Sequence, residues 1–239
     1  MKKKRILMMA FAAMLSVGVV SCGKDDDGTT NSGNNPTPGS DPQPQPADEW
    51  VDFGLPSGLL WARCNLGANT PDDLGNYYAW GETQPKEIYN HSTYKYCTAN
   101  GTQTIWTKYY PGSDTLTTLE AIDDAATAAL GNGTRTPTKA DWQELIDNTT
   151  FELATENNVD GWKFTSTING NTIFLPANGY LSGEDTHFFG EIGGYWSSSL
   201  DVEHPGYAWY LCFKRNTQEQ HIYSQNRYYG LMVRAVRQK

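Results

Sequence analysis

Apolar and polar residues alternate through the C-terminal third of the chain, which is typical of β-strands with one buried face. The clearest case is residues 162–175, WKFTSTINGNTIFL, where Asn169-Gly170 lies between two alternating runs. Asn-Gly favours a two-residue hairpin turn, so we predict that Phe164 pairs with Leu175. Four more stretches predict strands: GYWSSS (194–199), AWYLCF (208–213), HIYSQ (221–225) and LMVRAVR (231–237).

Helical spacing occurs in the middle of the chain. Leu119, Ile122, Ala126 and Leu130 recur at intervals of three and four residues and predict an amphipathic helix. A threonine at 117 or 118 can cap its start, and the glycine at 131 is suited to end it.

A second helix should begin at Thr138, whose hydroxyl can cap the first turn while Asp141 completes a capping box. Trp142 and Leu145 then share one face. Two further β-type runs flank the turn at residues 56–58. Together these elements predict an α+β fold, a mostly antiparallel twisted sheet with two short helices.

The N-terminus has the pattern of an export signal. A basic stretch (2–5) precedes an apolar run of about 15 residues, which is shorter than the roughly 20 needed to cross a bilayer. Residues 1–21 therefore read as a cleaved signal peptide. The following Cys22 completes a sequence that resembles a bacterial lipobox, so we expect it to carry the lipid that anchors the chain. An ordinary signal peptide with a chance cysteine is the alternative.

The acidic cluster at 25–27 is similar to the surface-export signal of Bacteroides-type lipoproteins, which implies an outer-membrane anchor and an outward-facing chain. A solvated start to a linker would look the same. Residues 22–48 are poor in apolar side chains and rich in Pro, Gly, Asn and Ser, so we expect a disordered tether. The globular domain then covers residues 49–239.

Charge and composition narrow the function further. The 239-residue chain has a formal charge of −9, which becomes −13 once the four positive charges of residues 2–5 are removed. Such a chain repels phosphate backbones, so nucleic-acid binding is not expected. Aromatic residues make up 13% of the chain, as in extracellular β-rich modules with Tyr and Trp contact surfaces. The sequence contains no HExxH, CxxC or GxSxG motif, so we predict no metal, cofactor or catalytic residue.

Eight motifs in order resemble the Fibrobacter succinogenes major paralogous domain and its DUF1566 relatives. They are VDFGLPSGLLWARCNLGA, GNYYAWGE, TYKYC, PTKADWQELI, FLPANGY, GYWSSS, AWYLCF and VRAVR, and they cover residues 50–237. The resemblance implies a C-type-lectin-like fold, related also to formylglycine-generating enzymes. Such domains occur on surface lipoproteins, some associated with adhesion or pili, and carry no agreed catalytic activity.

The chain departs from two relatives of that fold. Calcium-dependent lectins hold their ion with Asn and Asp side chains, whereas the nearest counterpart here is Trp196-Ser197-Ser198. Hydroxyls are poor ligands for a hard cation, so calcium-assisted sugar binding is not expected. Formylglycine-generating enzymes need a close cysteine pair near the C-terminus, where this chain has only Cys212.

Three cysteines remain after the lipidated one. Export permits disulfides, and Cys64 and Cys97 both lie in family-like motifs, so we predict that they form a pair. The alternative is three buried thiols that pack as small apolar side chains. Cys212, in an alternating strand, is predicted to be in the core.

Two polar loops with nearby aromatic residues are the candidates for ligand binding. Aromatic faces stack on sugar rings, while carboxylates and amides orient hydroxyls. The candidate residues are Asp185, His187, Asp201, Glu203, His204 and Tyr207. Separately, Asp114-Thr115-Leu116 resembles a short O-glycosylation sequon, which makes Thr115 a candidate modification site.

The sequence therefore predicts a cell-surface lipoprotein with a non-catalytic binding or adhesion domain, whose ligand is a glycan or a protein. The alternative is a structural or tip component of a surface fibre. A polysaccharide-acting enzyme is the weaker alternative, because it would need two carboxylates about 5 to 10 Å apart and no motif singles out such a pair.

Overall fold

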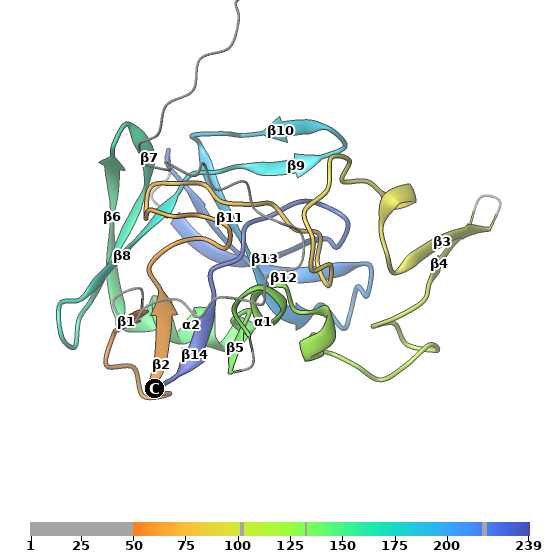
Figure 1. The fold of residues 1–239 in the computed structure, drawn as a ribbon, viewed down its shortest axis with the longest axis horizontal. Coiled ribbons are helices and arrows are strands. Elements are labelled where there is room, and N and C mark those ends of the chain that lie inside the picture. Colours follow the sequence, from red (N-terminus) through yellow and green to blue (C-terminus); the bar gives the residue numbers. More distant parts are fainter. Residues whose placement is uncertain (1–49, 101–102, 132, 217–218) are drawn as a thin grey trace, which may run out of the picture. The chain divides into compact units, whose positions relative to one another are not determined.

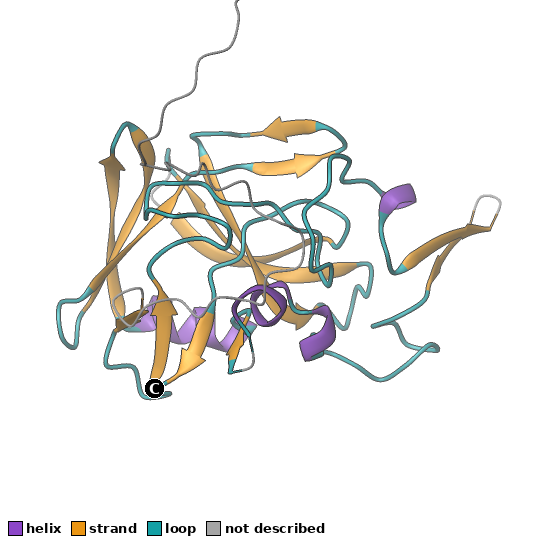
Figure 2. Cartoon of the chain, in the orientation of Figure 1, coloured by secondary structure: helices purple, strands orange, loops and turns teal. Residues whose placement is uncertain are grey.

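A computed structural model of the protein describes residues 50–100, 103–131, 133–216 and 219–239. The predicted signal peptide, the tether and Cys22 lie outside these described residues. Nearly all strand pairs are antiparallel, and the described part contains two short α-helices (Figures 1 and 2). The predicted α+β class is therefore confirmed.

The centre of the fold is a three-stranded antiparallel sheet of β11 (Ile192–Leu200), β12 (Tyr207–Lys214) and β13 (Glu219–Asn226). Alternation along β12 sends Ala208 to one side of the sheet and Leu211 to the other, where they enter different hydrophobic cores. The sheet thus lies between two buried cores, each rich in tryptophan and tyrosine.

Four other sheets complete the fold, and the β3–β4 hairpin extends away from the others (Figure 1). Sheet by sheet, their strands are β1 (Trp50–Asp52), β2 (Leu59–Ala62), β14 (Val236–Gln238) and β5 (Thr134–Arg135); β6 (Thr149–Glu156), β7 (Val159–Ser166) and β8 (Thr172–Pro176); β9 (Tyr180–Ser182) and β10 (Asp185–His187); and β3 (Cys97–Asn100) and β4 (Gln103–Trp106). Of the strand predicted at 231–237, only the end is regular; Leu231 and Met232 form isolated bridges.

The hairpin at 162–175 forms, but its predicted register is wrong. Phe164 pairs with Ile173 rather than Leu175, and the connecting loop holds four residues instead of two. The Ser166 hydroxyl accepts hydrogen bonds from the amides two and three residues on, at 3.1 and 3.2 Å. These bonds give the backbone amides of the wider turn a partner within the turn, which is why the Asn-Gly pair does not form the tight two-residue turn.

The first predicted helix is shorter than expected. A 3-10 turn, η3 (Ala121–Asp123), precedes α1 (Ala125–Leu130), and Ile122 is 78% exposed rather than buried. The cap is the carboxylate of Asp124, which accepts two amides of the first turn, instead of an upstream threonine. The helix ends at Gly131 as predicted, with φ 88°.

The second helix agrees with its prediction. α2 (Lys139–Asp147) starts with a complete capping box, in which the Thr138 hydroxyl and the Asp141 carboxylate each accept the other's backbone amide. Trp142 is buried, 4.7 Å between ring centroids from Trp61, and α2 packs on the central sheet. In the described part of the chain, no helix has the length and apolar character needed to cross a bilayer.

The predicted Cys64–Cys97 disulfide is wrong, because no disulfide joins the cysteines in the described part of the chain. The Cys97 sulfur lies 2.9 Å from Nε2 of His91. Cys64 interacts instead with the buried Arg234 guanidinium. Burial lowers the pKa of that guanidinium, and the electrostatic interaction with Cys64 acts in the opposite direction. Cys212 is buried, as predicted.

Candidate functional site

The two loops predicted to bind ligand border opposite ends of β11. Asp185 and His187 lie on β10, before that strand begins, and β10 pairs with β9. Glu203 and His204 lie in the connection that follows it, and Tyr207 begins β12. The two loops therefore do not meet along the strand, and what connects them is a row of aromatic side chains.

We call this row the aromatic band. Each neighbouring pair of rings has its centroids 5.2 to 6.4 Å apart, within the range of favourable aromatic contact. Its eight members, in order along the band, are Phe188, His187, Tyr180, Tyr229, Tyr228, His91, Trp106 and Tyr110, with both Phe188 and His187 against Tyr180.

None of these eight rings is fully buried. Phe188 is 53% exposed and Tyr110 is 37% exposed, and the other six lie between the buried and exposed extremes. Tyr180 and Tyr229 stack almost in parallel, 6° apart at 5.3 Å. Each ring is thus packed against its neighbours while the residue remains partly exposed to solvent, so the band is a row of packed aromatic side chains at the surface.

The second predicted loop borders the band. The ring of His204 lies 6.3 Å from that of Tyr207. Burial raises the pKa of the Tyr228 phenol, and the nearby Tyr229 and Tyr207 raise it further. Of the predicted ligand residues, His187 is therefore a band member, while His204 and Tyr207 lie at its side.

The predicted acidic residues have different positions. Asp201 is only 4% exposed, and its carboxylate accepts the amide of Glu203 at 3.2 Å and lies 3.4 Å from Nδ1 of His204. Asp201 therefore stabilises the conformation of its own loop and is not part of the exposed surface that a ligand could contact. Asp185 and Glu203 are exposed and able to orient ligand hydroxyls.

Arg227 supports the middle of the band from the interior of the protein. Its side chain is fully buried and donates to the carbonyl oxygens of Lys108, Tyr109 and Pro205 at 3.0 to 3.1 Å. Its guanidinium also lies 5.0 Å from the ring of Trp106. These contacts join the segment after β4 to the loop after β11, which fixes the band member Trp106 relative to that loop.

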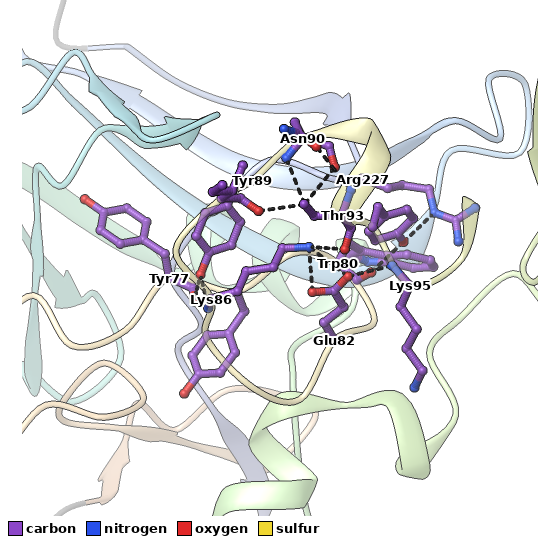
Figure 3. Close-up of polar contacts among 12 residues, drawn as sticks. Tyr77, Trp80, Glu82, Lys86, Tyr89, Asn90, Thr93, Lys95 and Arg227 are labelled. Atoms are coloured by element: carbon purple, nitrogen blue, oxygen red, sulfur yellow. Dashed lines mark hydrogen bonds and ion pairs between the residues drawn. The ribbon is translucent and has the colours of Figure 1, made fainter. Parts of the chain in front are cut away.

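A second network holds the short helix that carries His91 (Figure 3). η2 (His91–Thr93) is capped by the side chain of Asn90. The buried Glu82 carboxylate accepts Lys86 Nζ at 2.9 Å and the amide of Lys95 at 2.8 Å. Lys86 Nζ also donates to the last carbonyl of η2 at 3.1 Å. The network therefore ties both flanks of η2 to a single carboxylate.

Sequence reasoning missed six band members: His91, Trp106, Tyr110, Tyr180, Tyr228 and Tyr229. They lie on four separate segments of the chain, so no local spacing links them all. The one usable signal was a pair of adjacent aromatics outside any alternating run, as at Tyr228-Tyr229. In a strand, adjacent side chains point to opposite faces, so such a pair is not explained by a buried face.

The structure provides no support for a calcium site at the Trp196-Ser197-Ser198 motif. Ser197 is 0% exposed and Ser198 is 2% exposed, so their hydroxyls face the interior. Within the described residues, no three His, Cys, Asp or Glu side chains are grouped to hold a metal ion.

Glu191 and Glu203 are exposed acidic residues beside the two predicted loops, but they are not placed as the paired carboxylates of a glycosidase. Glu191 precedes β11 and Glu203 follows it. A nine-residue strand is about 30 Å long, well beyond the 5 to 10 Å that paired catalytic carboxylates require. The Glu191–Glu203 combination is therefore excluded as a catalytic pair.

Thr115 is exposed in the segment that precedes the bridge between Thr118 and Ser199, so its hydroxyl is accessible for modification.

Comparison with protein-family models, with curated proteins and with solved structures gave no match to this chain.

Proposed function

We propose that the protein is an outer-membrane lipoprotein, anchored through Cys22, whose C-type-lectin-like domain binds a glycan without catalysing a reaction. The motif resemblance and the export signal support the fold and the location. The single observation that carries the binding function is the aromatic band, a continuous row of eight fixed and partly exposed rings.

The band suits a saccharide better than a strongly charged ligand. Sugar rings present C–H faces that pack on aromatic rings, and their hydroxyls accept and donate hydrogen bonds at the edges. The exposed Asp185 and Glu203 carboxylates are acceptors for such hydroxyls, and His204 lies beside the band. Since the rings are already held by each other, little side-chain entropy is lost on binding.

The test is a binding measurement on Tyr228→Ala, which removes a ring from the middle of the band. We expect the variant to bind neutral cello-, manno- or galacto-oligosaccharides about five- to thirtyfold more weakly than the wild type, because one well-packed ring contributes on the order of 1 to 2 kcal/mol. Calorimetric titration with the oligosaccharide that binds the wild type best supplies the dissociation constants.

Leu153→Ala is the matched control, since it removes a 40% exposed apolar side chain from β6, a strand that carries no band residue. Its affinity should equal that of the wild type. Wild-type affinity in Tyr228→Ala, with the glycan still bound, would place the binding surface away from the band.

A further inference from the structure

A second hollow shares no lining residue with the aromatic band. It is open, has a volume of about 590 Å³, and lies between the start of α2 and the end of β11. β11 is irregular between Trp196 and Leu200, and there it pairs with a different segment: Leu200 N donates to Thr117 O at 2.8 Å, and Thr118 bridges Ser199. This irregular pairing forms one wall of the hollow.

The hollow is also lined by a cation that lies on an aromatic ring. Lys139 is the first residue of α2, and its Nζ lies 3.2 Å from the centroid of the Trp209 ring. The backbone amide of the same residue donates to the Ser199 hydroxyl at 3.1 Å. Among the described residues, no carboxylate is within ion-pair distance of the Lys139 ammonium, whereas Lys86, Lys95 and Lys108 each have one.

No acidic residue lines this hollow, although the chain as a whole has a formal charge of −9. Its polar lining consists of threonine and serine hydroxyls, the Gln143 side chain and the Lys139 ammonium. Its apolar lining includes Leu200, Trp209 and Val202, which is 57% exposed. The hollow thus combines an available positive charge, hydroxyl groups and an apolar wall.

We propose that this hollow is a second saccharide site, and that it takes a sugar bearing a carboxylate, of the uronic-acid class. The Lys139 ammonium binds the carboxylate, the hydroxyl-rich wall binds the sugar hydroxyls, and the apolar side chains receive the C–H face of the ring. The proposal shares with the proposed function the premise that the ligand is a saccharide, but it uses different residues.

The experiment measures binding of trigalacturonic acid, its methyl ester and hexaglutamate to the purified protein by calorimetric titration. We expect trigalacturonic acid to bind at least about tenfold more tightly than its ester, because esterification removes a charge-assisted hydrogen bond. This difference should shrink as salt is added, since the charges are partly exposed.

Two variants test the hollow itself. Lys139→Gln removes the cation and Gln143→Glu introduces a carboxylate, and each should weaken trigalacturonic acid at least about tenfold without altering binding of the ester. Lys163→Gln is the control: it makes the same change in net charge on β7 and should leave both affinities at wild-type values. Thermal melting confirms that all three variants are folded.

The outcomes separate this proposal from the band. Tyr228→Ala should leave the binding of trigalacturonic acid intact. If Tyr228→Ala also leaves the binding of the neutral oligosaccharide unchanged, while trigalacturonic acid binding depends on Lys139, the proposed function is refuted and the present inference stands. The present inference is overturned if trigalacturonic acid does not bind, if the ester binds equally well, or if Lys139→Gln has no effect. Equal or tighter binding of hexaglutamate would overturn the saccharide class and indicate an acidic peptide.

Discussion

Asp123 and Asp124 are adjacent and both buried, yet the pKa values of their carboxyl groups shift in opposite directions. Burial acts to raise both. At Asp123, hydrogen bonds from Lys108, Tyr109 and Lys95 outweigh burial and hold the pKa at about 2. At Asp124 the partners are neutral amides and a hydroxyl, so burial dominates and the pKa is raised. The difference is the presence of cationic partners.

Asp123 should therefore make stability depend on pH. Its folded pKa of about 2 lies below the ordinary value of 3.8, so the carboxylate stabilises the fold above about pH 4 and this contribution is lost as the pH falls towards 2. We expect the loss to be about 2 kcal/mol. The measurement is urea unfolding at several pH values for the wild type and Asp123→Asn.

Their difference in free energy of unfolding should shrink by that amount between pH 5 and pH 2. A difference that stays constant over this range would show that the carboxylate is not held by its two lysines in the folded state.

At the scale of elements, the hairpin of β11 and β12 depends on one glycine. A Cβ built at Gly193 would lie 2.0 Å from Cζ of Phe213, its cross-strand partner. Phe213 cannot readily move away, because it is fully buried and its ring stacks on Trp162 at 5.1 Å. The glycine is thus required by side-chain packing and not by its backbone conformation.

Gly193→Ala should lower the free energy of unfolding by about 2 kcal/mol, as expected for overpacking of a filled core. In a Phe213→Leu background the same substitution should cost less than half as much, because the smaller side chain leaves room for the methyl group. Chemical denaturation of the four proteins in this cycle supplies the energies. An equal cost in both backgrounds would contradict the packing explanation.

The elements that the sequence predicted well are those whose signals are local. The capping box at Thr138 and the strand over residues 208–213 each involve neighbouring residues, and both are confirmed, although the strand is buried on both faces and not on one. The register at Phe164 was wrong because the Ser166 hydroxyl stabilises a wider turn. The start of α1 was wrong because Asp124 provides a stronger cap than a threonine.

At the scale of the whole molecule, the candidate site could be predicted only in part. The loops around His187 and His204 contain polar and aromatic residues together, which the sequence reveals. The band between them is assembled from five chain segments, and its centre is held by Arg227, which is distant in sequence from the Lys108, Tyr109 and Pro205 carbonyls that it binds. Such an arrangement follows from tertiary packing and has no local sequence signal.

The fold thus presents two different surfaces. The aromatic band is suited to neutral sugar rings, and the hollow beside Lys139 and Trp209 to a carboxylated one. A lipid anchor and a tether ahead of the domain would present both to ligands outside the cell.

The most direct test of glycan binding by the band is a two-dimensional ¹⁵N–¹H spectrum, in which the indole N–H groups of the eight tryptophans report on separate places. Trp106 is in the band, whereas Trp142 and Trp162 are in the buried core. Titration with a neutral oligosaccharide that binds the protein should shift the Trp106 signal and leave the signals of Trp142 and Trp162 in place. Saturated binding with an unchanged Trp106 signal would contradict the account.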